Sequence, residues 1–285
     1  MTIAEAIESA RQQLAADEHL RDTARRDAET LLMHVANLTR ADLLAHPTRE
    51  LTPGQLDAYE ATVSRRLRHE PIQYITGQQE FYGLALAVTP AVLIPRPETE
   101  HLVEAVLARL PHDKLANILD IGTGSGAIAI ALAAHLPQAS VTAIDLSPSA
   151  LALARENART HSLGDRIHFL ISDLLTDLPP NEQTSYFDAI VSNPPYIPAK
   201  DAPQLHPQVR EHEPASALYA GADGLEIYRR LIPQAKKALK PDGLLALEIG
   251  HGQRDALEAL LSGWKNVSFL DDLQGIARVA LAHKK

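Results

Sequence analysis

The sequence predicts an α/β protein in which helices cover both faces of a mostly parallel sheet, with a small helical domain ahead of it. Three observations predict this fold class. Residues 1–75 show helical periodicity alone, from about residue 115 short apolar runs alternate with helical segments, and a glycine-rich turn joins the first run to the first helix. Strands that alternate with helices are joined by crossover connections, which produce a parallel sheet.

Composition narrows the class of protein. The chain has 285 residues, 45% of them hydrophobic, with no cysteine and a formal net charge of -9. The lack of cysteine excludes disulfides, thiolate nucleophiles and Cys-based metal sites, so we expect no metal centre and a cytoplasmic location. No uncharged apolar run approaches the roughly 18 residues of a membrane span, and we find no signal peptide. The negative charge argues against stable binding to nucleic acid.

The first 75 residues are predicted to form a helical bundle. Thr52 is expected to cap a helix with Pro53 at its first position, and Pro71 is expected to end that helix. The basic cluster from Arg65 to Arg68 on this helix is interpreted as a solvent-exposed face, with contact to a partner as the alternative.

Residues 76–95 change to a period of two, with apolar residues alternating around a glycine. This pattern predicts a β-hairpin that links the two domains. Pro95 and Pro97 then fix an extended segment, because each proline restricts its own φ angle and the residue before it. Thr99 is expected to cap a helix over residues 101–110.

The remaining residues alternate between β-rich and helical segments. The strands are expected at residues 117–121, 140–145, 167–171, 188–191, 244–249, 267–270 and 276–282. The helices are expected at residues 127–136, 147–159, 224–239 and 255–261, with a turn at 240–243. A short polar turn separates the last two strands, which predicts a terminal antiparallel pair.

The glycine-rich turn carries the first functional signal. Gly122-Thr123-Gly124-Ser125-Gly126 lies between a strand and a helix, and with Ala127 it fits the dinucleotide-binding fingerprint. Asp145 ends the next strand, where its carboxylate can accept hydrogen bonds from ribose hydroxyls. The pattern predicts a nucleoside-containing cofactor, with NAD and S-adenosylmethionine both open and a purely structural turn as the alternative.

Two further carboxylates favour S-adenosylmethionine. Asp120 stands directly before the glycine turn, and a negative charge there suits a cationic sulfonium better than a pyrophosphate. Asp173 ends the third strand, where it can accept a hydrogen bond from an adenine amino group, although a loop-capping role is the alternative.

The second functional signal is Asn193-Pro194-Pro195-Tyr196, which follows the strand predicted at 188–191. Neither proline can donate a ladder hydrogen bond, so the strand must end in a stiff loop that presents an amide and an aromatic ring. A rigid loop at a strand end is a favourable place for chemistry. An ordinary strand-terminating turn is the alternative interpretation.

Together these segments resemble a class I S-adenosylmethionine-dependent methyltransferase, with a Rossmann-like seven-stranded sheet. More narrowly, the chain resembles the HemK/PrmC family over nearly its whole length. The resemblance rests on Phe81-Tyr-Gly-Leu84, Val92-Leu-Ile-Pro-Arg-Pro-Glu-Thr-Glu100, Asp120-Ile-Gly-Thr-Gly-Ser-Gly126, Ser192-Asn-Pro-Pro-Tyr-Ile197 and Glu213-Pro-Ala-Ser-Ala-Leu-Tyr-Ala-Gly-Ala-Asp-Gly-Leu225. Members of that family methylate the side-chain amide nitrogen of a glutamine in peptide chain release factors.

The resemblance implies a division of labour along the chain. It implies substrate recognition by residues 1–75, a hairpin linker at 76–95 and catalysis by 96–285, with class I release factors as the protein partners. The cofactor residues would be Gly122, Thr123, Gly124, Ser125, Gly126, Asp145, Asp173, Leu174 and Asn193. Leu174 stands where members often carry an aromatic residue, so a stacking contact with adenine would be lost.

The same resemblance implies substrate binding by Asn193, Pro194, Pro195 and Tyr196. The Asn193 side-chain oxygen and the Pro194 carbonyl can each accept one N–H of a glutamine amide, which favours the positive charge that develops on nitrogen during attack. Tyr196 would pack against the flat amide. The proton can leave after attack, so no catalytic base is named, and His251 is interpreted as structural.

Four alternatives stay open on sequence alone. The same loop serves enzymes that methylate amino groups of nucleic-acid bases, in rRNA, tRNA or DNA. Another protein glutamine, such as one in a ribosomal protein, is a second possible target. A cofactor-binding scaffold without activity and an NAD-dependent enzyme are the other two, although neither explains the intact proline-rich loop.

Overall fold

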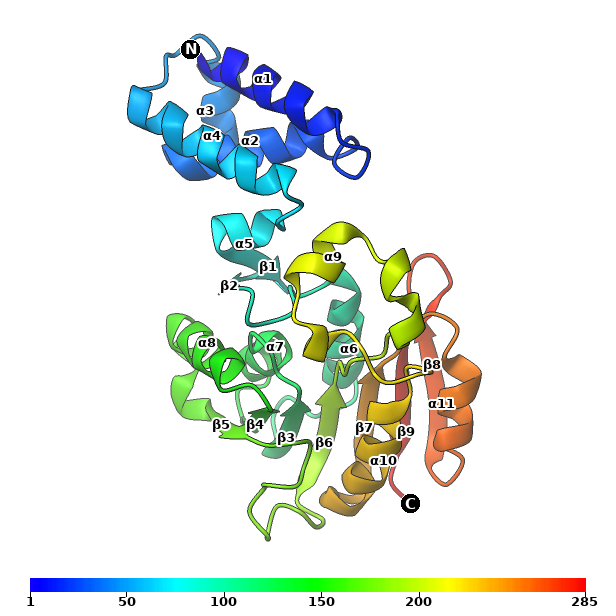
Figure 1. Cartoon of the computed structure of the whole chain (residues 1–285). Coiled ribbons are helices and arrows are strands. Elements are labelled where there is room, and N and C mark those ends of the chain that lie inside the picture. The colour runs from blue at the N-terminus through cyan, green and yellow to red at the C-terminus, as the bar shows by residue number, and fades with distance from the viewer. The chain divides into compact units, whose positions relative to one another are not determined.

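The structure, a computed structural model, describes residues 1–285 and groups them into two compact units (Figure 1). The helical unit comprises residues 1–78 together with 203–213. The second unit comprises residues 79–202 and 214–285, and it is called the catalytic unit after the role that the family resemblance implies. No helix in either unit has both the length and the apolar character needed to cross a membrane.

The helical unit is built from short amphipathic helices around one core. They are α1 (Ile3–Ala15), α2 (Ala24–Ala36), α3 (Arg40–Ala45), α4 (Pro53–Leu67), α5 (Ile72–Thr76) and α9 (Pro207–His212). The predicted start of α4 is confirmed, because the Thr52 side chain accepts a hydrogen bond from the backbone of Gln55 and Pro53 occupies the first turn. Apolar faces of α1, α2 and α4 meet at Leu14, Leu31 and Tyr59, all of them buried.

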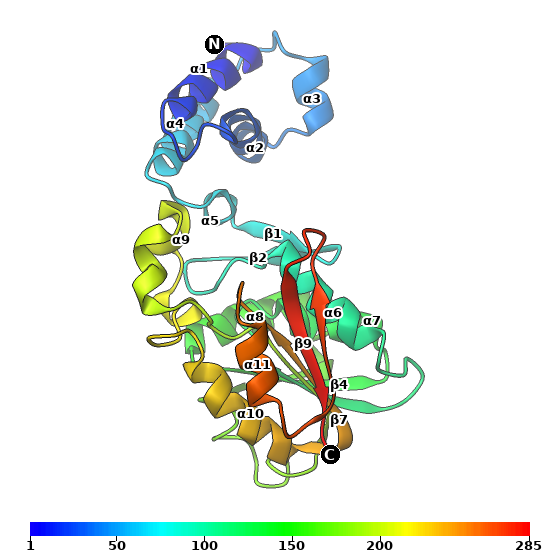
Figure 2. The same ribbon diagram turned by 90° about the vertical axis from the view of Figure 1, so that its right-hand side faces the viewer.

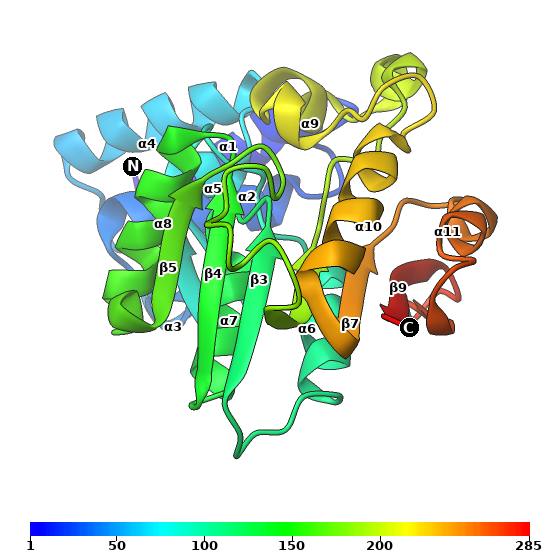
Figure 3. The ribbon, with the colours of Figure 1, turned by 90° about the horizontal axis from the view of Figure 1, so that it is seen from below.

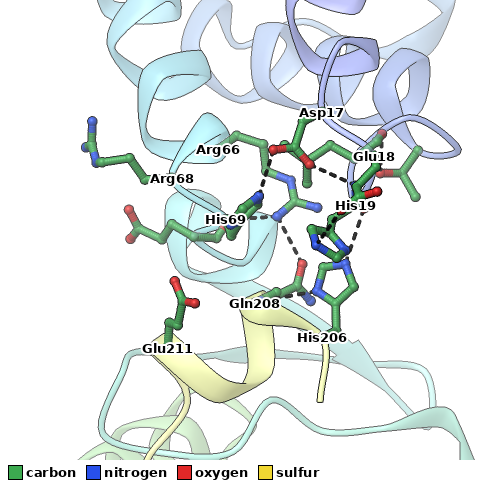
Figure 4. A network of polar contacts seen from close by, with 12 residues as sticks. Asp17, Glu18, His19, Arg66, Arg68, His69, His206, Gln208 and Glu211 are labelled. Carbon is green, nitrogen blue, oxygen red and sulfur yellow. Dashed lines mark hydrogen bonds and ion pairs between the residues drawn. The ribbon is translucent and has the colours of Figure 1, made fainter. Parts of the chain in front are cut away.

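Residues 203–213 belong to the helical unit although the catalytic unit flanks them on both sides in sequence. Figure 4 shows His206 beside His19, whose backbone carbonyl lies 3.2 Å from His206 Nε2. At the other end of α9, His212 Nε2 lies 2.8 Å from the backbone carbonyl of Arg68. These contacts attach residues 203–213 to the helical unit. This segment begins soon after the proline-rich loop in the sequence.

The basic cluster at the end of α4 is solvent-exposed only in part, because Arg68 is exposed but Arg66 is buried. Arg66 is only 4% exposed, and its Nε donates to the buried Asp27 at 2.8 Å. Its Nη1 donates to Gln208 Oε1 at 3.0 Å. Arg65 pairs with Glu70 at 2.8 Å. The expectation was wrong for Arg66, because periodicity does not reveal a distant carboxylate that can compensate a buried charge.

The catalytic unit contains a hairpin and a seven-stranded sheet. The hairpin is β1 (Gln78–Phe81) and β2 (Leu84–Ala87). The sheet strands are β3 (Ala116–Ile121), β4 (Ala139–Asp145), β5 (Ile167–Ile171), β6 (Phe187–Ser192), β7 (Leu239–Glu248), β8 (Lys265–Asp271) and β9 (Ala277–His283). Their order across the sheet is β5-β4-β3-β6-β7-β9-β8, and Figure 3 shows β5, β4 and β3 side by side. All neighbours are parallel except those that involve β9, so the predicted terminal antiparallel pair is confirmed.

Helices cover both faces of this sheet. Because successive side chains of a strand point to opposite faces, each face has its own hydrophobic core. The helices are α6 (Pro97–Leu107), α7 (Ala127–His135), α8 (Pro148–Thr160), α10 (Glu226–Ala238) and α11 (Arg254–Leu260), with 3₁₀ turns at Gly164–Arg166, Ala199–Gln204 and Ala215–Ala217. Figure 2 shows α10 and α11 on one side of β9 and α6 and α7 on the other. Ile118 packs in the core of α6 and α7, and its neighbour Leu119 in the core of α10 and α11.

Two sequence expectations for this unit need correction. The helix predicted at 101–110 begins at Pro97, because proline is favoured in the first turn, so Thr99 lies inside α6 and does not cap it. The turn predicted at 240–243 is the start of β7, which pairs with Phe187 through a register shift. A bulge of this kind accommodates a proline that a regular ladder would exclude.

The sheet register brings the functional loops together. β3 and β6 are neighbours in the centre of the sheet, although two strands intervene in sequence, and Ile121 pairs with Ser192. Ser192 also pairs with Leu247 of β7. The glycine loop, Asn193 and Glu248 therefore leave the sheet at the same edge. Open α/β sheets bind ligands at the carboxyl ends of their strands, where the strand order reverses.

Candidate active site

A cavity of about 270 Å³ opens at this edge of the sheet. Most of the predicted cofactor and substrate residues line it, namely Gly122, Thr123, Gly124, Ser125, Asp145, Asp173, Leu174, Asn193, Pro194 and Pro195. Gly126 and Tyr196 do not line it, so the structure gives these two residues other roles.

The glycine loop brings bare backbone to the cavity. Gly122 and Gly124 have φ angles of 70° and 55°, and no atom lies within 4 Å of the point where a Cβ would stand. These are left-handed conformations that glycine adopts without strain. Gly126 instead caps α7, and a Cβ there would lie 3.0 Å from Ile130 and 3.2 Å from Ala154. The third glycine therefore serves the packing of α7 against α8.

Asp120 supports the loop from beneath and is fully buried. Its Oδ2 accepts a hydrogen bond from Thr123 Oγ1 at 2.6 Å, and its Oδ1 has no partner. Burial raises the pKa of the Asp120 carboxyl to about 7. Asp120 does not itself line the cavity, so any effect of its charge on a cationic ligand acts through the glycine loop, and that effect stays a prediction.

Asp145 ends β4 and lines the cavity, while its role as an acceptor for ribose hydroxyls stays a prediction. Its Oδ2 accepts from the Gly124 backbone N–H and its Oδ1 from the Ser147 backbone N–H, each at 2.9 Å. Both oxygens keep further lone pairs, so the carboxylate can accept two ligand hydroxyls. In the loop after the adjacent strand β5, Asp173 pairs with Arg230 at 2.6 Å and Leu174 is buried beside it.

Asn193 is held in one orientation by a buried residue from another segment. Its Nδ2 donates to Thr99 Oγ1 at 3.1 Å, and Thr99 Oγ1 donates to Glu248 Oε2 at 2.6 Å. Thr99 and Glu248 are 4% and 2% exposed. The amide oxygen of Asn193 is thereby left to accept hydrogen bonds at the cavity. Sequence reasoning missed both Thr99 and Glu248 as site residues.

Tyr196 supports the loop and does not line the cavity. Its hydroxyl donates to Glu248 Oε1 at 3.3 Å, and its ring packs against the core of α10 and α11. Burial raises the pKa of Tyr196 well above its ordinary value, so the hydroxyl stays protonated and donates. Its backbone carbonyl accepts from Gln253 Nε2 at 2.9 Å. Gln253 is a third residue that the sequence did not single out, and His251, interpreted as structural, is exposed.

Two glycines allow this close packing. Gly224 has a φ of 77°, and a Cβ there would lie 2.3 Å from the backbone oxygen of Tyr196 and 2.8 Å from Gln253 Nε2. A Cβ on Gly250 would lie 2.9 Å from the Tyr196 ring. Glycine is therefore required at positions 224 and 250, because the backbone at both positions packs directly against Tyr196 of the proline-rich loop.

Comparison with known families divides the chain in a similar way. Residues 5–77 match the PrmC N-terminal domain family, and residues 112–270 match a methyltransferase domain family. The second match spans more than half of the chain and includes the glycine loop, Asp145, Asp173 and the Asn193 loop.

Individual relatives extend this similarity to full length. The chain is 44% identical over 284 residues to a release factor glutamine methyltransferase of Koribacter versatilis (strain Ellin345), covering 100% of this chain and 99% of that protein. It is 45% identical over 288 residues to the protein of the same name in Moorella thermoacetica (strain ATCC 39073 / JCM 9320), with the same coverages.

A solved structure confirms the fold class. It is the T. thermophilus 16S rRNA N2 G1207 methyltransferase (RsmC) in complex with AdoMet and guanosine, with a TM-score of 0.55 and 20% identity. The alignment covers 73% of this chain and 50% of that chain. At this identity the likeness concerns the fold alone.

Gly224→Ala is expected to destabilise the catalytic unit by about 2 kcal/mol and to lower turnover, because alanine is strained at the φ of 77° and its methyl group would push the Tyr196 carbonyl away. Urea denaturation and initial rates measure both effects. Gly54→Ala is the matched control, since its Cβ would meet no atom within 4 Å. Wild-type stability and turnover in the Gly224 variant would contradict this role.

Proposed function

We propose, since the chain belongs to the release factor glutamine methyltransferase family, that it methylates the side-chain amide nitrogen of the glutamine in the Gly-Gly-Gln motif of class I release factors, with S-adenosylmethionine as the methyl donor. The chain is a methyltransferase by that membership. The observation that favours a planar –NH₂ group as the acceptor is the orientation of Asn193, whose Nδ2 is engaged by Thr99 so that its Oδ1 is available.

The cavity fits the proposed cofactor. Gly122 and Gly124 form a cradle of backbone without side chains, Asp145 can accept from the ribose hydroxyls, and Leu174 offers an apolar contact for the adenine. Asp173, partly exposed beside Arg230, has acceptor capacity left for an adenine amino group. When bound, S-adenosylmethionine supplies an electrophilic methyl group on a positively charged sulfur.

The acceptor loop suits a planar –NH₂ group. Pro194 and Pro195 have no backbone N–H, so hydrogen-bonding groups at this rim are carbonyls and the Asn193 oxygen. Asn193 Oδ1 and the Pro194 carbonyl would each accept one proton of the glutamine amide. Two acceptors orient the nitrogen and stabilise the positive charge that develops on it in the transition state.

No strong base is needed for this reaction. The amide nitrogen becomes acidic only once it has attacked the methyl carbon, and the proton can then leave to water. The chain's main contributions are therefore to place nitrogen at near-attack distance and to provide acceptors fixed before the reaction begins.

A base amino group of nucleic acid would offer the same two N–H donors, so the loop alone does not separate the two acceptors. Family membership and the match of residues 5–77 to the PrmC N-terminal domain favour the release factor. The reaction is proposed to occur in the cytoplasm, where translation terminates.

The wild-type enzyme with radiolabelled S-adenosylmethionine is expected to label a class I release factor and to leave tRNA, rRNA and DNA unlabelled. Asn193→Ala should label the release factor about 100-fold more slowly, because one transition-state acceptor is lost. Single-turnover rates measure this loss. Label that enters only nucleic acid would overturn the proposed acceptor.

Asp145→Ala is expected to weaken S-adenosylmethionine binding at least about tenfold, because a carboxylate that accepts ribose hydroxyls is removed. Titration calorimetry measures the dissociation constant. Asp145→Asn keeps one acceptor oxygen and should fall between the alanine variant and wild type. Equal affinities in all three proteins would reject the ribose role.

We further propose that the helical unit recognises the folded release factor. The catalytic loop contacts only a glutamine and its neighbours, which is too small a surface for specificity among proteins. The separate family match over residues 5–77 supports a dedicated module.

Removal of residues 1–75 is expected to raise the KM for an intact release factor about tenfold or more while changing that for a short Gly-Gly-Gln peptide little. Steady-state kinetics with both substrates test this, and turnover of the peptide shows that the catalytic unit is still folded. A parallel increase for both substrates would count against a recognition role.

A further inference from the structure

Glu248 is a buried carboxylate that the reaction described above does not use. It ends β7 and is 2% exposed, yet no lysine or arginine forms an ion pair with it among those the structure records. Its two oxygens accept from two hydroxyls, those of Thr99 at 2.6 Å and Tyr196 at 3.3 Å. Burial of a carboxylate is costly, so its retention here calls for a function.

We propose that Glu248 and Thr99 are positioning residues that fix the polarity of the Asn193 amide, so that its oxygen faces the substrate. This inference rests on the proposed function and deepens it. The series Glu248–Thr99–Asn193 joins the end of β7, the first turn of α6 and the proline-rich loop.

The number of protons on each group determines the direction of these hydrogen bonds. A carboxylate can only accept hydrogen bonds, so the single Thr99 hydroxyl proton must point to Glu248. The remaining lone pairs of that oxygen can only accept, so they select the –NH₂ end of Asn193. The amide oxygen is left at the cavity, where it accepts from a substrate N–H. Without this series the amide could turn over and present two donors to an amide that also donates.

The series also determines which substrates can bind. An Asn193 oxygen beside the Pro194 carbonyl accepts from a group that donates two N–H bonds. A hydroxyl or a tertiary amine in the same place would leave at least one buried acceptor unpaired, which costs affinity. The buried carboxylate therefore contributes to specificity for –NH₂ without touching the substrate.

Protonation of Glu248 would break the series. Burial raises the pKa of Glu248 to about 7, and the charge of Glu98 on α6 acts in the same direction. The Thr99 and Tyr196 hydroxyls and the charge of Arg278 on β9 lower it, and the Tyr228 hydroxyl of α10 bonds to the backbone oxygen of Glu248. A protonated carboxyl can donate to Thr99, which then can donate to the Asn193 oxygen. Activity should therefore fall as pH decreases below about 7.

A pair of variants at Thr99 tests the series. Thr99→Val removes the hydroxyl at nearly constant shape and is expected to reduce kcat about tenfold, the equivalent of one hydrogen bond. Thr99→Ser restores the hydroxyl and should recover to within about threefold of wild type. The affinity for S-adenosylmethionine and the unfolding midpoint serve as controls for folding. Equal kcat values for the valine and serine variants would overturn the proposal.

A double-mutant cycle separates positioning from general disruption. In the Asn193→Ala background Thr99 has no amide to orient, so Thr99→Val should cost less than about twofold there. The same tenfold loss in both backgrounds would show that Thr99 does not act through Asn193.

The pH dependence of kcat/KM distinguishes positioning from a purely structural role, because a purely structural role of Glu248 would not affect it. Glu248→Gln can still accept from Thr99 through its amide oxygen but cannot titrate, so the decrease of kcat/KM below pH about 7 should become clearly smaller in that variant, with any remainder due to Asp120, whose pKa is also about 7. An unchanged acidic limb would contradict the role of Glu248.

The double-mutant cycle of Thr99→Val and Asn193→Ala is measured with the –NH₂ acceptor that the wild-type enzyme labels. If that acceptor is not a release factor, the proposed function fails while the cycle still decides the role of Thr99 and Glu248. If the release factor is labelled but the losses are additive, only the positioning role fails.

Discussion

The substrate side of the site depends on one buried carboxylate. Glu248 accepts from Thr99 and Tyr196, and through Thr99 it determines how Asn193 faces the cavity. These residues come from a helix, a loop and a strand that are far apart in sequence. Because hydroxyl groups have one proton and carboxylates have none, the series has a direction, and that direction places an acceptor where we propose that a glutamine amide donates.

The sheet makes this arrangement possible. Its central parallel strands end at one edge, and the register of β3, β6 and β7 sets the glycine loop, Asn193 and Glu248 beside one another. Small residues then permit the close approach of the layers. Gly126 lets α7 pack on α8, and Gly224 lets its loop pass behind Tyr196. The proposed cofactor side of the cavity therefore includes the bare backbone of Gly122 and Gly124, and the proposed substrate side is a loop held by contacts behind it.

Local patterns predicted the strands, the glycine loop and the positions of Asp145 and Asn193 at strand ends beside the cavity, because strand alternation, turn chemistry and strand ends are encoded by neighbouring residues. Contacts between distant segments were not predictable in this way. Thr99 looked like a helix cap, but its partner Glu248 is 149 residues away. Arg66 looked solvent-exposed, but it pairs with Asp27, 39 residues away, and with Gln208, 142 residues away. Asp120 looked like a charge beside the ligand, but its contact with Thr123, which the sequence did not indicate, buries it under the glycine loop.

The central claim is that Asn193 and Pro194 together accept both protons of a glutamine amide. A crystal structure with S-adenosylhomocysteine and a Gly-Gly-Gln peptide tests it most directly. The glutamine nitrogen is expected to lie about 2.7–3.2 Å from both Asn193 Oδ1 and the Pro194 oxygen. Asn193 Nδ2 is expected to keep its hydrogen bond to Thr99 Oγ1. A glutamine bound elsewhere, or an Asn193 amide turned to donate to the peptide, would contradict it.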